Sequence, residues 1–218
     1  MPSLKKVVIV GAGGFGREVA EIFKDLNSVS REWDIIGFID DNASLWGGEI
    51  NEMPVRGGLD WLVENKKDVG CVVAIGDPES KKAIVEKLER NNIRFYNAIH
   101  PSVMKSEFIT LGKDVIICAG VILTVNISIG DHVCINLNTT VGHDAIIENC
   151  CSIMPNATIS GNDILGKCSY IGTGATIIHG KKIGDRSTIG AGAVVVNDIP
   201  DNVVAVGIPA KVIKNKEN

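Results

Sequence analysis

Between residues 111 and 195, an aliphatic residue occupies every sixth position, and this spacing restricts the possible folds more than any other feature of the chain. The run covers fifteen consecutive positions without an insertion. If roughly one residue in four were aliphatic at random, fifteen matches in a row would be vanishingly improbable, so the repeat is genuine. The positions are Leu111, Ile117, Leu123, Ile129, Ile135, Val141, Ile147, Ile153, Ile159, Leu165, Ile171, Ile177, Ile183, Ile189 and Val195.

A period of six residues predicts short strands joined by turns, with one aliphatic side chain of each strand pointing inward. Hexapeptide repeats of this kind indicate a parallel β-helix. If three hexads make one triangular coil, fifteen hexads make about five coils, stacked at roughly 4.8 Å per coil. We therefore expect residues 103–218 to form a β-helix domain.

Aromatic residues are confined almost entirely to the other part of the chain. Of the ten in the sequence, eight precede residue 100, and only Phe108 and Tyr170 follow it. A narrow interior filled by stacked aliphatic side chains has no space for rings, which explains why the repeat lacks them. The split predicts a separate first domain, over residues 1–102, with an ordinary core.

Residues 1–102 alternate between expected strands and expected helices. Apolar, β-branched runs predict buried strands, and the segment after the first strand carries apolar residues at helical spacing. Strands that alternate with helices form a parallel sheet covered by helices on both faces, so we expect a Rossmann-like α/β domain. The expected strands cover residues 5–10, 35–39, 71–75 and 94–99.

The first expected strand runs directly into a glycine-rich turn and then into a helix. Gly11, Gly13 and Gly16 have the spacing of the phosphate-binding turn of Rossmann-type domains. There, glycine lets the backbone approach a phosphate, and the helix N-terminus favours negative charge. The alternative is that these glycines only allow a tight turn. About 100 residues hold one half of a dinucleotide fold, which favours a mononucleotide, or a nucleotide attached to another group, over NAD.

Acidic residues follow two of the expected strands. Asp40 or Asp41 ends the second strand, where a carboxylate can bind a ribose or a base. Asp77 comes after Gly76 at the end of the third strand and can also cap the next helix. We expect the nucleotide part of a substrate to contact Gly11, Gly13, Gly14, Phe15, Asp40, Asp41, Gly76 and Asp77.

The repeat region, over residues 103–213, resembles the hexapeptide-repeat acyltransferases. Residues 206–211, with the sequence VGIPAK, look like the closing motif that helps those enzymes hold coenzyme A. With the glycine turn and the segments 38–41, 74–76 and 99–101, the whole chain resembles the bacterial sugar acetyltransferases of the PglD and NeuD type. The resemblance implies a left-handed β-helix, acetyl-CoA as acetyl donor, and a homotrimer with coenzyme A and the active site between neighbouring subunits.

Acetyl transfer from a thioester to an amine needs a base for the amine proton and donors for the developing oxyanion. His143 lies two residues after inward Val141 and directly before Asp144, which predicts an outward position near a corner of the coil. A nearby carboxylate raises the basicity of histidine. In the family that the chain resembles, such a pair is the catalytic base and its partner, so we expect both residues to be catalytic. The alternative is an exposed His–Asp pair on a turn.

Three further histidines have weaker support. His179 lies two coils beyond His143 on the same corner, with Gly161 between them, so we expect the two histidines roughly 10 Å apart, too far to share one proton. His179 is then a surface or trimer-contact residue, or it lines the coenzyme A groove. His132 has no supporting pattern. His100 is expected to be structural, or to touch the substrate near the nucleotide domain.

The resemblance also implies which residues contact coenzyme A. The backbone of Gly161 faces the acetyl thioester, and Lys214 can meet the cofactor phosphates. Two positions depart from the family. Phe15 stands where related enzymes can carry a histidine in the glycine turn, and Ser152 stands where PglD-like enzymes carry a second histidine near the acetyl donor. The implied cofactor-binding residues are Ser152, Gly161, Thr173, Ala191, Gly207, Pro209 and Lys211.

These patterns lead to the hypothesis of an acetyl-CoA-dependent N-acetyltransferase that acts on a nucleotide-linked amino sugar, with His143 as general base. PglD-like enzymes act on a UDP-linked 4-amino-4,6-dideoxy sugar. O-acetylation of sialic acid or another sugar hydroxyl, as in NeuD-like enzymes, would use the same base and stays open. So do two functions of a different class, a non-catalytic nucleotide-binding protein and an NAD-dependent enzyme.

Composition sets further limits. The net charge of −4 argues against a nucleic-acid-binding surface. The apolar run at residues 7–12 is too short for a membrane span or an export signal, so we expect a cytoplasmic protein. The six cysteines show neither a C-x-x-C motif nor zinc-ligand spacing, so we expect reduced thiols that pack as small apolar residues, and no bound metal.

Overall fold

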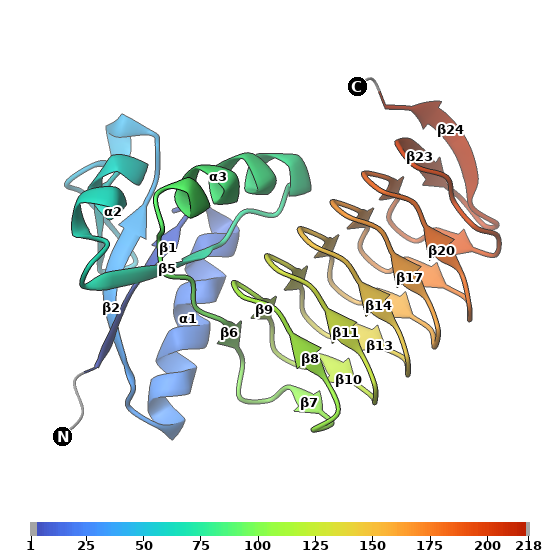
Figure 1. Ribbon diagram of the computed structural model, residues 1–218, viewed down its shortest axis with the longest axis horizontal. Coiled ribbons are helices and arrows are strands. Elements are labelled where there is room, and N and C mark those ends of the chain that lie inside the picture. The colour runs from blue at the N-terminus through green and yellow to red at the C-terminus, as the bar shows by residue number, and fades with distance from the viewer. Residues whose placement is uncertain (1–3, 217–218) are drawn as a thin grey trace.

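The computed structural model describes residues 4–216 and consists of an α/β domain followed by a three-sided stack of short strands (Figure 1). In Figure 1 the coils of the stack extend away from the α/β domain, and the last strand lies at the far end. This is the expected Rossmann-like domain followed by a left-handed parallel β-helix.

The sheet of the α/β domain has five strands in the order β3-β4-β2-β1-β5. All neighbours pair in parallel except β3, which is antiparallel to β4. The β-branched run of β1 lies between β2 and β5, where both sides of a parallel strand are buried, and Val7, Val8 and Ile9 are 0% exposed. The strands are β1 (Lys5–Val10), β2 (Trp33–Ile39), β3 (Glu49–Ile50), β4 (Met53–Gly57) and β5 (Val69–Val73).

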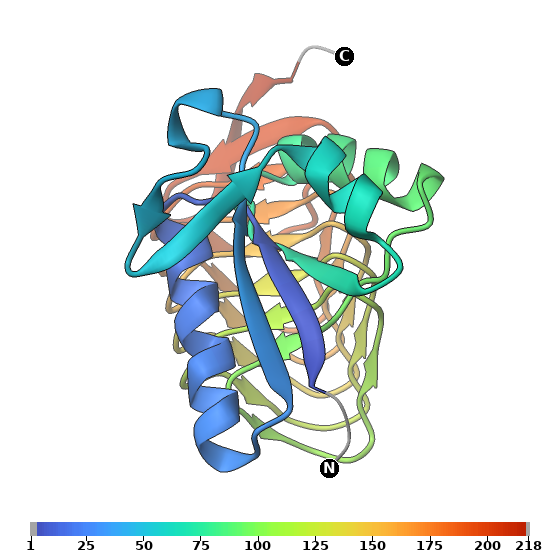
Figure 2. The ribbon, with the colours of Figure 1, turned by 90° about the vertical axis from the view of Figure 1, so that its left-hand side faces the viewer.

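Helices cover both faces of this sheet, because successive side chains of a strand point to opposite sides. Ile9 packs with Phe23 of α1 on one face, and Val8 packs with Leu62 of α2 and Leu88 of α3 on the other. Figure 2 shows α1 on one side of the strands and α2 and α3 on the other. No helix within residues 4–216 is long and apolar enough to cross a membrane. The helices are α1 (Gly14–Val29), α2 (Leu59–Asn65), α3 (Pro78–Arg90) and a short 3-10 turn, η1 (Ala43–Leu45).

The remaining strands form three parallel sheets, which are the sides of a triangular prism. We name each side after its first strand: the β6 face, the β7 face and the β8 face. Paired strands are eighteen residues apart, as in the pair Cys134 and Ser152, so each coil contains three hexads as expected.

The strands of the β6 face are β6 (Ala98–Ile99), β9 (Ile116–Ile117), β12 (Cys134–Ile135), β15 (Ser152–Ile153), β18 (Tyr170–Ile171), β21 (Thr188–Ile189), β23 (Val203–Val206) and β24 (Lys211–Asn215), the last of which is antiparallel to β23. Those of the β7 face are β7 (Met104–Lys105), β10 (Ile122–Leu123), β13 (Thr140–Val141), β16 (Thr158–Ile159), β19 (Thr176–Ile177) and β22 (Val194–Val195). Those of the β8 face are β8 (Thr110–Leu111), β11 (Ser128–Ile129), β14 (Ile146–Ile147), β17 (Ile164–Leu165) and β20 (Lys182–Ile183).

The predicted inward positions fill the prism. From Ile117 to Val195, each of the fourteen aliphatic side chains at six-residue spacing is at most 2% exposed. Leu111, in the open first coil, is half-buried but still packs against this core. Burying a branched side chain of this size contributes about 1.5–3 kcal/mol, and among the described residues this core contains no aromatic ring.

The expected strand over residues 94–99 does not form as one strand. Phe95 makes a single bridge to Cys71 at the edge of the α/β sheet, whereas β6 belongs to the prism and pairs with β9. Between them, the Asn97 side chain donates to the carbonyl of Gly112 at 3.0 Å and ties the chain to the first coil. The apolar residues on either side of Asn97 do not reveal this change of sheet, because both sheets bury the same kind of side chain.

The α/β domain lies against the β6 face of the prism. Ile116 and Cys134 of this face belong to the same buried cluster as Phe23 of α1. From α3, the buried Lys81 ammonium donates to the Ser152 hydroxyl at 3.1 Å. All six cysteines of the chain are buried as free thiols, in agreement with the expected packing role.

A buried carboxylate joins the two domains at the corner between the β8 and β6 faces. Asp114, 1% exposed, accepts hydrogen bonds from the Val73 amide at 2.8 Å and from His132 Nδ1 at 2.8 Å. Burial raises the pKa of Asp114, and the hydrogen bond from His132 opposes that shift. His132 also lies 3.4 Å from Glu89 of α3, so it is a structural residue of the domain interface.

Candidate active site

His143 lies on the corner between the β7 and β8 faces, after β13 and before β14. Its Nδ1 is 2.8 Å from the Asp144 carboxylate, and its side chain is 54% exposed. A carboxylate only accepts hydrogen bonds, so Nδ1 carries the proton and Nε2 of the neutral ring is the acceptor. The hydrogen bond from His143, followed by one from Asn126, lowers the pKa of Asp144.

Asn126 is a site residue that the sequence interpretation missed. It lies eighteen residues before Asp144, one coil earlier on the same corner, and its Nδ2 donates to the second carboxylate oxygen at 3.2 Å. The carboxylate is therefore held from both sides and orients the His143 ring. The coil period contains this signal, because residues eighteen apart stack directly on each other.

Gly161 lies one coil beyond His143, and the imidazole extends over it. A Cβ added to Gly161 would be 2.6 Å from His143 Nε2 and 2.7 Å from Cε1, so the ring occupies the space of the missing side chain. Within residues 4–216, no backbone or side-chain group accepts a hydrogen bond from the Gly161 amide. The corner therefore offers an imidazole nitrogen and a free N–H side by side, as acyl transfer requires.

The expectation that His143 and His179 lie roughly 10 Å apart is wrong. Their ring centroids are 5.9 Å apart, with an angle of 49° between the ring planes. The estimate used the spacing of the coils, whereas side chains lean along the prism axis, and Gly161 between them has no side chain to keep them apart. The two histidines and Gly161 form one continuous surface on this corner.

Asp163 supports this corner from within. Its fully buried carboxylate accepts from the Ser160 amide at 2.8 Å and from the Lys181 amide at 2.7 Å, and so ties together the turns that carry Gly161 and His179. Burial raises the pKa of Asp163 to about 6, and the backbone hydrogen bonds and His179 act in the opposite direction. A buried aspartate at this position was not anticipated from the sequence.

The glycine turn has two structural and two open positions. Gly11 has φ +103, and a Cβ there would be 2.9 Å from Ile75; a Cβ on Gly16 would overlap the carbonyl oxygen of Gly11. Gly13 and Gly14 are exposed, and no atom crowds either Cα except the end of Arg17. The first turn of α1 carries no acidic side chain, so its free N–H groups can bind an anion.

Arg17 adds a cation to this turn that was not predicted. Its Nε lies 3.4 Å from the carbonyl of Gly13, and its guanidinium is beside Gly14. Phe15, in contrast, is half-buried and packs on the core of the α/β domain. The sequence signal for Arg17 is its place one residue after Gly16, within the first turn of the helix.

The expected acidic residues organise the loops around this turn. Asp40 accepts from the amides of Ala12 and Asn42, both at 2.9 Å, and Asp41 accepts from the amide of Leu59, the first residue of α2, at 3.1 Å. Asp40 and Asp41 also line a cavity of about 180 Å³ together with Gly11. Sequence reasoning assigned them only to the ligand, whereas the structure gives both a role in holding the loops.

Gly76 and Asp77 follow β5 beside the same region. Asp77 is the N-cap of α3 and accepts from the Ser80 amide at 2.8 Å, as expected for a capping residue. That hydrogen bonding lowers the pKa of Asp77. Gly76 has open space around its Cα.

The residues implied for coenzyme A border the β7 face, with one exception. Gly161 lies on the corner between the β7 and β8 faces. Thr173 and Ala191 are exposed on the corner between the β6 and β7 faces. Gly207 continues this surface, because its carbonyl accepts from the Val194 amide of β22 at 3.0 Å. Pro209 and Lys211 are exposed beside it.

Ser152 is the exception, and its interpretation as a cofactor-binding residue is wrong. It lies on the β6 face, where α3 covers it, and it is 0% exposed. Its hydroxyl accepts from Lys81 at 3.1 Å and from the Cys134 thiol at 3.3 Å. The six-residue spacing predicts that the first residue of each strand points outward. It does not predict that the α/β domain covers the β6 face.

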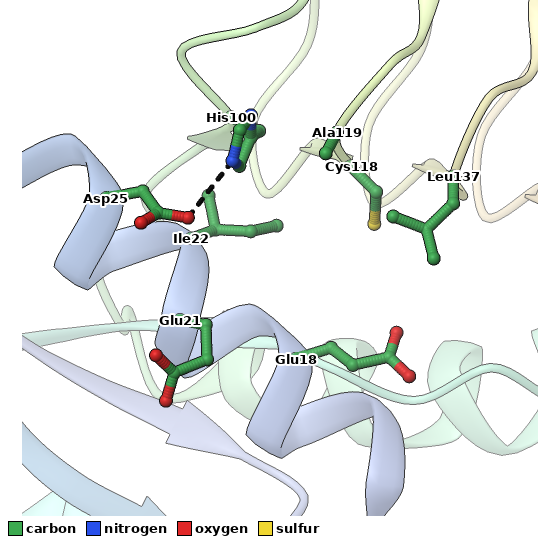
Figure 3. A pocket seen from close by; sticks show the side chains of 8 residues that line it. All are labelled: Glu18, Glu21, Ile22, Asp25, His100, Cys118, Ala119 and Leu137. Carbon is green, nitrogen blue, oxygen red and sulfur yellow. Dashed lines mark hydrogen bonds and ion pairs between the residues drawn. The ribbon is translucent and has the colours of Figure 1, made fainter.

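His100 connects the two domains and borders a pocket of about 220 Å³ between α1 and the prism (Figure 3). Its Nε2 lies 3.0 Å from the Asp25 carboxylate, and its Nδ1 lies 2.8 Å from the Ser102 hydroxyl. Both ring nitrogens are therefore engaged, in agreement with the structural role. Glu18 and Glu21 of α1 line the same pocket (Figure 3).

The α/β domain with its glycine turn and His143 lie on different sides of the prism in one chain. The α/β domain covers the β6 face, whereas His143 is on the corner between the other two faces. The aliphatic interior of the prism separates them. The glycine turn of a chain therefore does not form one site with the His143 of the same chain.

Comparisons with known proteins identify relatives of this chain. The family model of the PglD N-terminal domain matches residues 6–88. UDP-N-acetylbacillosamine N-acetyltransferase of Bacillus subtilis is 30% identical over 126 residues, which span 53% of this chain and about half (52%) of that relative.

Solved structures match the whole chain. A variant of perosamine N-acetyltransferase from Caulobacter crescentus, in complex with CoA and GDP-perosamine, is 31% identical with a TM-score of 0.89, and the match covers 98% of this chain and 99% of that one. The acetyltransferase domain of PglB from Neisseria gonorrhoeae, in complex with acetyl coenzyme A, is 30% identical with a TM-score of 0.88, and the match covers 97% and 100%.

Proposed function

Because the chain belongs to the PglD-type sugar acetyltransferases, we propose that it transfers the acetyl group of acetyl-CoA to the amino group of a nucleotide-linked amino sugar, such as a UDP- or dTDP-linked 4-amino-4,6-dideoxy sugar. The observation that carries this proposal is the free Nε2 of His143, which Asp144 orients beside the amide of Gly161. The solved relatives in complex with CoA, acetyl coenzyme A or GDP-perosamine support the substrate classes.

His143 is the general base of the proposed reaction. As the amine nitrogen attacks the thioester carbonyl, Nε2 takes the proton that the nitrogen loses. The Asp144 carboxylate, which accepts a hydrogen bond from Nδ1 at 2.8 Å, selects the tautomer in which Nε2 is the acceptor and stabilises the imidazolium that forms. The lowered pKa of Asp144 supports this role, because the carboxylate stays charged at neutral pH.

Gly161 is the proposed oxyanion donor. Its amide has no partner within residues 4–216 and lies beside the base, so it can bond to the thioester oxygen as negative charge develops there. One such donor typically contributes about 2.7–4 kcal/mol to transition-state stabilisation. The cofactor then extends along the β7 face toward Thr173, Ala191, Gly207, Pro209 and Lys211.

The nucleotide of the sugar substrate is assigned to the α/β domain. Gly13 and Gly14 leave space for a diphosphate at the N-terminus of α1, and Arg17 supplies a positive charge there. The cavity beside Asp40 and Asp41 is the proposed place of the ribose or base.

The active site is assigned to the contact between two chains of a homotrimer. Within one chain the prism interior separates His143 from the nucleotide pocket, so a partner must supply one of the two. Exposed apolar side chains on the β7 and β8 faces, such as Ile122 at 39% and Ile146 at 42%, are consistent with such contacts.

Replacing the base tests the proposal. His143→Ala should lower turnover by about two orders of magnitude or more, because the amine proton loses its acceptor, while the dissociation constant of CoA stays within about twofold. Thiol release from acetyl-CoA is measured with UDP-, dTDP- and GDP-linked 4-amino sugars and with free sialic acid.

Lys182→Ala, an exposed residue on β20, is the matched control and should leave turnover unchanged. Unchanged turnover in His143→Ala would refute the assignment of the base. Acetylation of sialic acid alone would move the assignment to O-acetyl transfer.

A further inference from the structure

His179 is a titratable group on the active-site surface that the proposed reaction does not yet use. It is exposed, and its ring lies 5.9 Å from that of His143, centroid to centroid. At this separation, a group that lies between the two rings can contact both of them. Among the described residues, no hydrogen bond joins the His179 ring to another side chain, so its nitrogens can serve a ligand.

The order of residues along the corner indicates which part of the reacting complex lies beside His179. His143, Gly161 and His179 are eighteen residues apart, on three successive coils stacked at roughly 4.8 Å. The attacking nitrogen belongs at His143 and the thioester carbonyl at Gly161. The cofactor residues Ala191 and Gly207 lie further toward the last coil, so the sulfur lies on the His179 side of the carbonyl.

The buried Asp163 carboxylate fixes the turn that carries His179, because it accepts hydrogen bonds from the amides of Ser160 and Lys181. An imidazolium beside a leaving thiolate can give it a proton. His143 differs from His179 because a carboxylate accepts a hydrogen bond from its Nδ1, which leaves Nε2 of the neutral ring as the acceptor.

We propose that His179 is a second catalytic residue, which donates a proton to the coenzyme A sulfur while His143 accepts the proton of the amine. The inference rests on the proposed acetyl transfer. The amine nitrogen forms a bond to the acetyl carbon, and its proton goes to His143 Nε2. The carbon–sulfur bond breaks, and its electron pair and the proton of His179 form the free thiol. Between turnovers, His143 loses one proton to solvent and His179 regains one, so the balance is closed.

The pH dependence of turnover distinguishes this role from a structural one. A base that must be unprotonated gives a rise of kcat with pH, and an acid that must be protonated gives a fall at higher pH. His179→Gln should lower kcat about tenfold or more at neutral pH and remove the alkaline fall. His143→Ala should lower kcat further, by about a hundredfold or more.

Lys182→Gln, an exposed neighbour on β20, is the control, and calorimetric titration with CoA checks that the cofactor site is intact in each variant. The assignment of His179 is overturned if kcat of His179→Gln stays within about twofold of that control. It is also overturned if kcat falls with the alkaline limb unchanged, or if the wild-type enzyme has no alkaline limb. A wild-type enzyme that acetylates none of the nucleotide-linked amino sugars would instead overturn the proposed function, and this inference with it.

Discussion

At the scale of single residues, the candidate site depends on Gly161 as much as on the histidines. The missing Cβ leaves space for the His143 ring, whose Nε2 would otherwise be 2.6 Å from it. The same absence lets His143 and His179 approach to 5.9 Å. Gly161 therefore determines the direction of the His143 ring, in addition to its proposed role as the donor to the thioester oxygen.

Gly161→Ala should displace the His143 ring and lower kcat by about tenfold to hundredfold, because small errors in the position of a base are costly. The three atoms nearest to the added methyl group all belong to the flexible side chain of His143, so the melting temperature should change by less than about 2 °C. Steady-state kinetics and thermal unfolding measure both effects.

Ser160→Ala, on the same turn, serves as the control, because only the backbone amide of Ser160 is hydrogen-bonded among the described residues. A Gly161→Ala enzyme with wild-type kcat would show that the base does not need this space.

At the scale of elements, the two-residue strands act as one continuous stack. Each strand contributes one inward aliphatic side chain, and the next coil covers it, so each layer of the narrow core holds one such side chain from each of the three faces. The interior thus accepts isoleucine, leucine, valine and alanine and has no space for rings. This is the physical reason for the uneven distribution of aromatic residues in the sequence.

Ile153→Phe, at the centre of the stack, should therefore destabilise the protein by about 1–3 kcal/mol through overpacking. Tyr170→Phe, on the next coil of the same face but pointing outward, should stay within about 0.5 kcal/mol of the wild type. Chemical unfolding of the two variants provides the comparison. Equal stability of both would contradict a close-packed interior.

The contact between β5 and the corner of the prism between the β8 and β6 faces depends on the carboxylate of Asp114. Asp114→Ala would leave the Val73 amide and His132 Nδ1 buried without an acceptor, and should lower the free energy of unfolding by about 2–5 kcal/mol. Asp131→Ala removes a comparable acceptor on a partly exposed corner, for the Lys113 amide, and should lower it by about 1 kcal/mol. If thermal unfolding ranks the two variants equally, Asp114 does not stabilise the domain contact as inferred.

At the scale of the whole molecule, the two parts of the proposed active site lie on different sides of the prism. The α/β domain lies on the β6 face, and His143 lies on the opposite corner. A single chain therefore holds both parts of the proposed active site without joining them. The proposed homotrimer would join them, because each chain would supply a different part to each of its neighbours.

Mixing two inactive variants tests this arrangement. His143→Ala removes the base, and Gly14→Asp places a negative charge at the proposed phosphate position, where the N-terminus of α1 tolerates an acidic residue. If each site combines two chains at random, co-expression of the two variants should restore about one quarter of the wild-type rate. Separately purified variants mixed without subunit exchange are the control. No recovery in co-expressed trimers would mean that each site lies within one chain.

Sequence patterns were sufficient for everything that repeats along the chain. The hexad spacing predicted the inward residues of the prism, and the pattern of strand, glycine turn and helix predicted the Rossmann-like domain. These features depend on local periodicity. Because the same spacing of apolar residues recurs many times, a few positions that depart from it do not obscure the pattern. The pairing of His143 with Asp144 was also predictable, because the two residues are adjacent.

The contacts between distant segments were not predictable, because no periodic rule links the residues that form them. Sequence alone did not reveal that α3 covers Ser152, that Asn126 holds Asp144, or that the rings of His143 and His179 meet. Each of these depends on how side chains lean or on which face another domain covers. Periodicity along the chain thus established the two architectures and placed His143 and Asp144 on an outward corner, whereas packing in three dimensions determined which side chains lie beside them.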